Sequence, residues 1–158
     1  MGKSTFSVTQ IDEEIAALVK KTDHRLAAIW AKACAERVLH YFEETFPEDP
    51  RPRQALETLQ AWIDTGNFQM AVIRSASLAA HAAAREVGED NPARSAARSA
   101  GQAAASAHVA THAIAAANYA LQTIYRAANE GEPDLAVDRE RNWQYQRLLT
   151  INQGGSKE

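Results

Sequence analysis

Alanine dominates the middle of this chain, where 21 of the 50 residues from 71 to 120 are alanine. Alanine has the highest helix propensity, and its small side chain lets helices approach at or below the short end of the usual spacing of about 8–10 Å. The other apolar residues recur every three or four positions, and no alternating strand pattern of useful length occurs. We predict an all-α fold, a compact bundle of about six to seven helices with tightly packed alanine-rich helices.

The length of 158 residues suits one domain with a continuous hydrophobic core. We assign residues 9–150 to a single helical domain, residues 1–8 to a flexible N-terminus and residues 151–158 to a flexible C-terminal tail. Because alanine buries little apolar area, larger side chains must supply the bulk of the core. The aromatic residues expected to do so are Trp30, Tyr41, Phe42, Phe46, Trp62, Phe68, Tyr119 and Trp143.

Apolar periodicity and helix-ending residues divide the domain into helices. The predicted segments are a short helix after Thr9, a long helix from Asp23 to about Phe46, a helix from Pro52 to Asp64, a helix capped by Asn67 that runs to about Val87, two helices within residues 93–129 separated between Gly101 and Thr111, and a last helix from Leu135 to Leu149 with Trp143 and Leu148 as anchors. Gly66 and Gly88 suit the left-handed positions at which helices end, and Asn91 followed by Pro92 begins the next helix. The break between Gly101 and Thr111 is expected because one unbroken helix would be about 55 Å long.

The charge and the ends of the chain exclude several classes of partner. The net charge is -3, so the protein has no overall basic field to attract a nucleic-acid backbone. No uninterrupted run of about 18 apolar residues occurs, as a membrane-spanning helix would require. The first residues are polar and Cys34 is the single cysteine, so we expect neither a secretion signal nor an internal disulfide. We expect a cytoplasmic protein with no nucleic-acid partner and no membrane partner.

Three histidines form the most suggestive polar cluster. His108 and His112 are four residues apart, the spacing that places two imidazoles on one helix face, and His81 lies on an earlier helix. Three imidazoles could hold a metal ion, but no carboxylate lies on the same helix and no metalloprotease motif follows His108. We favour the interpretation that these side chains form hydrogen bonds between neighbouring helices. We therefore expect no metal and no cofactor, and keep a metal- or ligand-binding module as the alternative.

A polar line on the predicted helix after Asn67 contains Arg74, Ser77, His81 and Arg85. Arg85 with His81 is the better candidate for a binding site, since a guanidinium suits a carboxylate on a partner or on a neighbouring helix. The alternative is structural pairing with a nearby carboxylate of Glu86, Glu89 or Asp90. The next helix carries a serine-rich line formed by Ser95, Ser99, Gln102 and Ser106, and Asn118 and Gln122 follow further on. Such polar lines could face each other across a groove, but for the serine line we favour the interpretation of an ordinary solvated face.

Carboxylates gather where the helix that ends near Phe46 meets a proline-rich turn. Glu48 and Asp49 lie in this turn, close to Arg51. Loop ends tolerate variation between partners, so a surface of this kind is a reasonable place for recognition. We predict that Glu48 and Asp49 are exposed and contribute to an acidic binding edge.

Catalytic chemistry has little support in the sequence. Cys34 lies on an apolar stripe one turn after Trp30, which predicts a buried thiol with a raised pKa and little nucleophilicity. No glycine-rich phosphate loop, no recognisable catalytic serine motif and no pair of carboxylates on a cleft can be identified. We expect a protein that is not an enzyme.

Several segments resemble a known family. They are residues 30–39 (WAKACAERVL), 46–53 (FPEDPRPR), 80–85 (AHAAAR), 101–113 (GQAAASAHVATHA), 119–121 (YAL) and 139–144 (RERNWQ). In these segments the chain resembles the bacterial putative immunity proteins related to the fifth immunity group of polymorphic toxin systems. The likeness covers most of residues 25–147.

The resemblance implies an all-helical protein that neutralises a toxin by binding it, with the cognate toxin as its partner and no active site to carry over. Two classes stay open at this point. One is a toxin-binding immunity protein, and the other is a small helical module that binds a metal or small ligand through the histidine-bearing helices. The candidate binding residues are His81, Arg85, His108, His112, Glu48 and Asp49.

Overall fold

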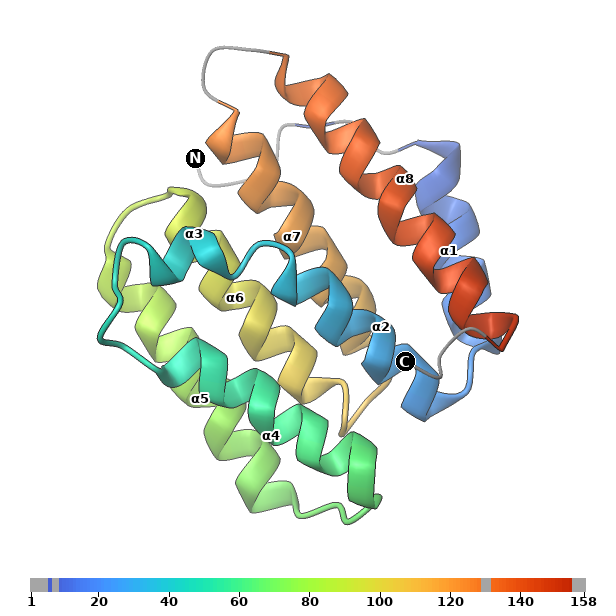
Figure 1. Cartoon of the computed structure of the whole chain (residues 1–158), viewed down its shortest axis with the longest axis horizontal. Coiled ribbons are helices and arrows are strands. Elements are labelled where there is room, and N and C mark those ends of the chain that lie inside the picture. The colour runs from blue at the N-terminus through green and yellow to red at the C-terminus, as the bar shows by residue number, and fades with distance from the viewer. Residues whose placement is uncertain (1–5, 7–8, 129–131, 155–158) are drawn as a thin grey trace.

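A computed structural model describes residue 6, residues 9–128 and residues 132–154. These residues form helices and contain no strand (Figure 1). The helices are α1 (Gln10–Lys21), α2 (His24–Glu36), α3 (His40–Glu43), α4 (Arg51–Thr65), α5 (Met70–Val87), α6 (Pro92–Ala105), α7 (His112–Ala127) and α8 (Pro133–Asn152). The predicted all-α class is confirmed, whereas the predicted number of six to seven helices was too low, because the described residues contain eight.

The additional helix arises within the segment 23–46, where one long helix was predicted. The α-helix stops after Glu36, and the amides of Val38 and Leu39 donate to the carbonyls three residues earlier. This tighter geometry rotates the chain relative to a continuous α-helix. Val38, Leu39 and Phe42, which follow this break, are all at most 1% exposed.

Several helix ends follow the predicted signals. The amide of Thr9 donates to Oδ2 of Asp12 at 2.7 Å at the start of α1. Asn91 Oδ1 accepts a hydrogen bond from the first turn of α6 at 3.0 Å. Gly66 and Gly88 follow α4 and α5 with φ angles of 73° and 87°, a left-handed conformation that favours glycine.

The prediction that Asn67 caps α5 was wrong. The helix begins three residues later, at Met70, and Gln69 occupies the cap position. Thr65 Oγ1 accepts a hydrogen bond from the Asn67 amide at 3.1 Å, which keeps this residue in the turn after α4.

The structure differs from the predicted domain at its C-terminal boundary. Of the predicted flexible residues 1–8, all but Phe6 lie outside the described residues, as do residues 155–158 of the predicted tail. Helix α8 continues to Asn152, and Ile151 is 1% exposed. The helical domain therefore extends past the boundary predicted at residue 150, because Ile151 still packs into the core.

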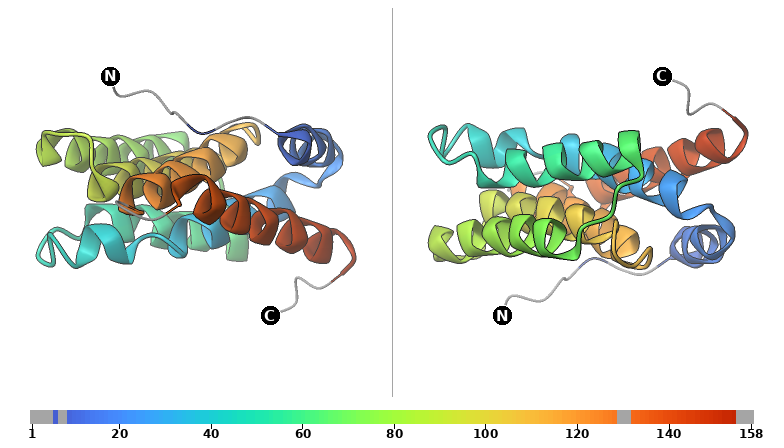
Figure 2. Two further views of the ribbon diagram at one scale, coloured as in Figure 1. Left: turned by 90° about the horizontal axis from the view of Figure 1, so that it is seen from above. Right: turned by 90° about the horizontal axis from the view of Figure 1, so that it is seen from below.

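Helix α6 lies at the centre of the bundle. Figure 2 shows α2, α3 and α4 in one layer and α5, α6 and α7 in the other, and α6 packs against all five of its companions. The buried residues of α6 are all small, namely Ala93, Ser95, Ala96, Ala97, Ser99, Ala100, Gly101, Ala103 and Ala104. Larger side chains would hold these neighbours apart. The alanine-rich sequence thus permits one helix to contact five others. The predicted break between residues 101 and 111 is confirmed, because α6 ends at Ala105 and α7 begins at His112.

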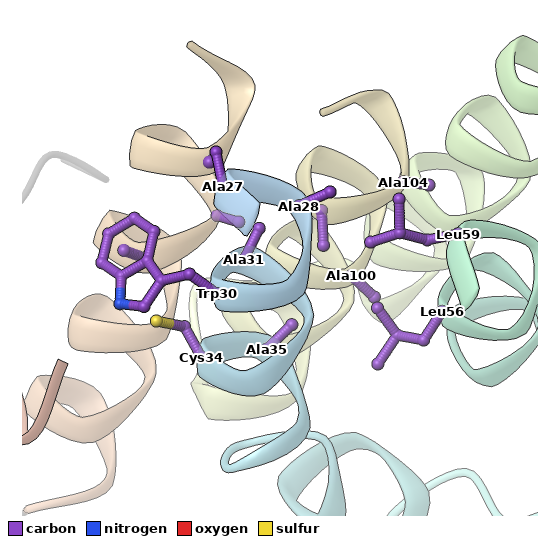
Figure 3. Close-up of a cluster of buried hydrophobic side chains, with 14 of the residues drawn as sticks. Ala27, Ala28, Trp30, Ala31, Cys34, Ala35, Leu56, Leu59, Ala100 and Ala104 are labelled. Carbon is purple, nitrogen blue, oxygen red and sulfur yellow. The ribbon is translucent and has the colours of Figure 1, made fainter. Parts of the chain in front are cut away.

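The larger side chains of the core come from several helices around α6, among them α2 and α4. Trp30 is fully buried, and its Nε1 donates to the carbonyl of Gln144 at 2.8 Å. Figure 3 shows Leu56 and Leu59 of α4 beside the small side chains of α6. The other predicted aromatic core residues are buried or partly buried, except Phe68, which is 43% exposed because it lies in the connection between α4 and α5.

Polar contacts attach α8 to the rest of the bundle. Arg37 donates to Glu140 twice, from Nε at 2.7 Å and from Nη2 at 3.0 Å. Arg141 Nε donates to Asp12 of α1 at 2.9 Å. The predicted anchor Leu148 is fully buried, whereas Trp143 is partly buried. None of the helices described is both long and apolar enough to cross a membrane.

Candidate functional site

A groove of about 710 Å³ runs between α4 and α5, which lie side by side at one edge of the bundle (Figure 2). Its lining consists mainly of small side chains, namely Ala61, Ala71, Ala76, Ala79, Ser75 and Thr58, with Val72, Gln54, Glu57 and Arg51. A second hollow of about 240 Å³ shares Thr58, Ala61 and Val72 with it and extends to Trp62. Small side chains allow close helix packing inside the fold, and where they line the surface between α4 and α5 they leave a depression.

Exposed apolar side chains concentrate on α5 and in the segment that leads into it, and one of them, Val72, lines the groove. Six large apolar side chains are exposed among the described residues, and four of them lie between positions 68 and 78, with exposed fractions of 43% to 54%. They are Phe68, Met70, Val72 and Leu78. Concentrated exposed apolar surface is a common feature of protein interaction sites. These four residues are called the apolar patch below.

Charged side chains lie at the Arg51 end of the groove. Arg51 Nη2 contacts Asp49 Oδ2 at 2.7 Å and Glu86 Oε1 at 2.6 Å. These hydrogen bonds lower the pKa of both carboxyl groups. The turn residue Glu48 is exposed, as predicted. Asp49 is partly buried and paired with Arg51, so only part of the predicted acidic edge presents uncompensated charge.

His108 and His112 do not lie on one helix face, and that prediction was wrong. The α-helix ends at Ala105, so His108 lies exposed in the turn that precedes α7 and stacks on Phe68 with ring centroids 6.0 Å apart. His112 begins α7, and its Nδ1 donates to Gln102 Oε1 at 2.7 Å. The expected hydrogen bond between helices is thus confirmed for His112. Among the described residues, no three or more His, Cys, Asp or Glu side chains are placed to hold a metal ion.

His81 forms a contact between α5 and α6. Arg98 Nη1 donates to its Nδ1 at 2.9 Å, so the proton of the neutral ring is on Nε2. Burial lowers the pKa of His81 to about 4, and the positive charges of Arg98 and Arg85 act in the same direction. His81 is therefore neutral near pH 7 and fixes the position of Arg98. Its predicted role as a hydrogen-bonding group between helices is confirmed.

Arg85 is exposed near the end of α5. The carboxylate of Glu86 pairs with Arg51, and that of Asp90 pairs with Arg94 at 3.4 Å. His81 and Arg85 lie on the same helix, and neither lines the groove. The positive charge of Arg85 lowers the pKa of His81. The hydrogen bonds described for these residues do not join the two side chains.

The interpretation of the serine line as a solvated face was wrong. Ser95, Ser99 and Ser106 are fully buried. Ser99 Oγ donates to the carbonyl of Ala116 at 2.8 Å, and Ser95 Oγ donates to Gln122 Oε1 at 2.7 Å. A serine is scarcely larger than an alanine, so it fits the crowded interface of α6 and satisfies its hydroxyl by bonding to α7.

Another cavity, separate from the groove, opens beside α6 and α7 and has a volume of about 320 Å³. The sequence did not lead us to predict it. Its lining is polar and consists of Asp90, Arg94, Ser95, Arg98, Tyr119, Gln122 and Arg126. We call it the arginine pocket. The signal in the sequence was the four-residue spacing of Arg94 and Arg98 and of Gln122 and Arg126, which places each pair on one helix face.

The single cysteine is not suited to nucleophilic chemistry. Cys34 is fully buried, and burial raises the pKa of its thiol well above the ordinary value. A thiol in this state carries little thiolate and has no access to solvent. Among the described residues, the groove with its apolar patch and the arginine pocket are two surface features that could hold a partner.

Comparison with known proteins gives one match. The family model described as "Imm-5 like putative immunity protein" matches residues 17–151. This range includes all of α2 to α7, nearly all of α8, the C-terminal part of α1, the groove and the arginine pocket. No curated protein and no solved structure is significantly similar to the chain. Since the match covers most of its length, the chain belongs to the Imm-5 like putative immunity protein family.

Proposed function

We propose that this protein is an immunity protein that neutralises a bacterial toxin by binding it in a stoichiometric complex, without turnover. Membership of an immunity protein family supports the class of function. The single structural observation that carries the proposal is the groove between α4 and α5 with its apolar patch. We place the encounter with the toxin in the cytoplasm.

The groove combines apolar and charged side chains in the way that a protein interface does. Such interfaces combine an apolar centre with a polar and charged rim. Here Val72 lines the groove and is 49% exposed, while Arg51 lines it and carries its contacts to Asp49 and Glu86. The predicted acidic turn thus becomes one end of the proposed surface. Charges at such a rim select the partner and speed its encounter with the protein.

The two helices that form the groove are held rigidly. Both α4 and α5 pack against α6 as well as against each other. Leu56 and Leu59 anchor α4, and Ile73 and Ala80 anchor α5, all at most 4% exposed. A surface that is already ordered loses little conformational entropy on binding. This rigidity suits an inhibitor that acts by occupying its target.

The test is co-expression with the toxin encoded beside the gene, followed by titration of toxin activity with purified protein. We expect growth to be rescued and inhibition to saturate near an equimolar ratio. Rescue by trace amounts would indicate turnover, and absence of rescue with every neighbouring gene product would contradict the function itself.

Substitutions then test the surface. Val72→Asp places a charge in the groove and should weaken toxin binding by about tenfold or more, the effect typical of a central interface residue. Leu135→Asp is the matched control, since Leu135 is 43% exposed on α8 and lies outside the groove. Equal toxin affinity in the two variants would show that the toxin binds elsewhere.

A further inference from the structure

The arginine pocket carries more positive than negative charge. Arg94, Arg98 and Arg126 line it together with one carboxylate, that of Asp90. Asp90 contacts Arg94 at 3.4 Å and Arg126 at 3.7 Å. Asp90 is therefore shared between Arg94 and Arg126, and the third guanidinium group of the lining remains to be explained.

Arg98 is that third group. No carboxylate of the described residues forms an ion pair with it, and its Nη1 donates to the neutral imidazole of His81 at 2.9 Å. Burial and the nearby charges of Arg94 and Arg85 lower the pKa of Arg98, against an opposing effect of Tyr119. A partly buried guanidinium held in place by a neutral group is an uncompensated cation at the wall of a cavity.

Neutral side chains complete the wall. Ser95 Oγ accepts a hydrogen bond from Arg126 Nη1 at 2.9 Å and donates to Gln122 Oε1 at 2.7 Å. These bonds fix the orientation of Arg126 and leave the amide N–H groups of Gln122 as donors. Donors held in position by neighbouring side chains bind an anion without first having to be ordered.

From this arrangement we infer that the arginine pocket is a binding site for an oxyanion, either the carboxylate of an acidic side chain or a phosphate group. Guanidinium groups bind both ligands through pairs of parallel hydrogen bonds, whereas nothing in the wall other than Asp90 would repel them. This anion site is independent of the proposed toxin binding, because the pocket lies on α6 and α7 and the groove lies on α4 and α5.

The test is a titration of the full chain with sodium phosphate and, separately, with sodium acetate and a short glutamate-containing peptide, followed by NMR at constant ionic strength. We expect saturable shifts of the backbone amides around Arg94, Arg98 and Gln122. Stronger binding of phosphate than of either carboxylate would identify a phosphate-bearing ligand. Stronger binding of the peptide would identify an acidic side chain. No saturable shift with any of the three probes would overturn the inference.

Matched substitutions distinguish a specific anion-binding site from non-specific electrostatic attraction of anions to the protein. Arg98→Gln should weaken binding of the preferred probe by about tenfold, the usual effect of removing a charge-assisted hydrogen bond. Arg74→Gln removes the same charge from an exposed position of α5 outside the pocket and should leave the affinity unchanged. Arg94→Gln serves as a second pocket variant if Arg98→Gln does not fold. Equal affinities of the pocket variants and Arg74→Gln would overturn the inference.

Discussion

A Cβ atom at position 101 would lie 2.7 Å from Nε2 of His81, closer than such atoms approach in real structures. Gly101 is therefore required by a close approach between α5 and α6 and not by an unusual backbone angle. The contact has a second polar element, because Ser77 Oγ donates to the Gly101 carbonyl at 2.9 Å. The imidazole is held on its other side by Arg98, so it has little room to move away.

The first prediction follows from this contact. Gly101→Ala should destabilise the fold by about 1–2 kcal/mol, because overpacking costs about 1–3 kcal/mol and the gain in helix propensity of about 1 kcal/mol offsets only part of it. Urea denaturation measures the difference. His81→Ala removes the ring, so the same Gly101→Ala change made in that background should cost much less. A full cost in both backgrounds would show that the clash is not with His81.

The second prediction concerns pH. The pKa of His81 is lowered to about 4 in the folded protein, so the unfolded chain binds more protons than the folded chain between about pH 6.5 and pH 4. The free energy of unfolding should therefore fall as the pH decreases through this window. After allowance for solvent screening, we expect His81 to contribute a loss of about 1–2 kcal/mol.

Comparison with a variant isolates this contribution from the carboxylates. His81→Gln keeps an oxygen that accepts the hydrogen bond from Arg98 but does not titrate. Urea denaturation at pH 7 and pH 4.5 should show a smaller loss for His81→Gln than for the natural protein. An equal loss in both proteins would mean that His81 titrates normally in the folded state.

The sequence predicted those features that depend on local chemistry. The glycines after α4 and α5 and the cap at Asn91 mark helix ends by themselves, and the alanine content alone indicated close packing. Tertiary packing decided the rest. The break after Glu36 and the burial of Ser95 follow from what the neighbouring helices require, which periodicity cannot reveal.

The candidate site was predicted less well, for a related reason. His108 and His112 have helical spacing, but spacing places two side chains on one face only if the helix is continuous, and here it ends at Ala105. The groove and the arginine pocket combine residues from two helices each. Their existence depends on which helices are neighbours, and a single sequence does not state this.

The third prediction tests the attachment of α8. Glu140→Ala should destabilise the protein by about 1.5–3 kcal/mol, because it removes two charge-assisted hydrogen bonds at a carboxylate whose side chain is only 9% exposed. Arg37 also lies over the Trp143 ring at 4.0 Å, so its displacement would disturb that contact too.

Glu36→Ala is the control for this measurement. Glu36 forms an exposed pair with Lys32 at 2.8 Å, and exposed pairs of this kind contribute about 0.5 kcal/mol or less. Thermal denaturation should therefore separate the two variants clearly. Similar melting temperatures for Glu140→Ala and Glu36→Ala would show that the Arg37 contact contributes no more than a surface pair.

The last prediction concerns the centre of the bundle. Ala100 of α6 is fully buried and lies beside Leu56 of α4 (Figure 3). Ala100→Leu adds three carbon atoms to a helix that has neighbouring helices in both layers of the bundle. The helices must therefore separate, or the new side chain must adopt a strained rotamer. Overpacking usually costs about 1–3 kcal/mol, and we expect about 3 kcal/mol here, because α6 packs against five other helices. Ala17→Leu, at an exposed position of α1, adds the same atoms without this crowding and should change stability by less than about 0.5 kcal/mol. Urea denaturation of the two variants makes the comparison, and equal stabilities would mean that the small residues of α6 are not what sets the spacing of the helices.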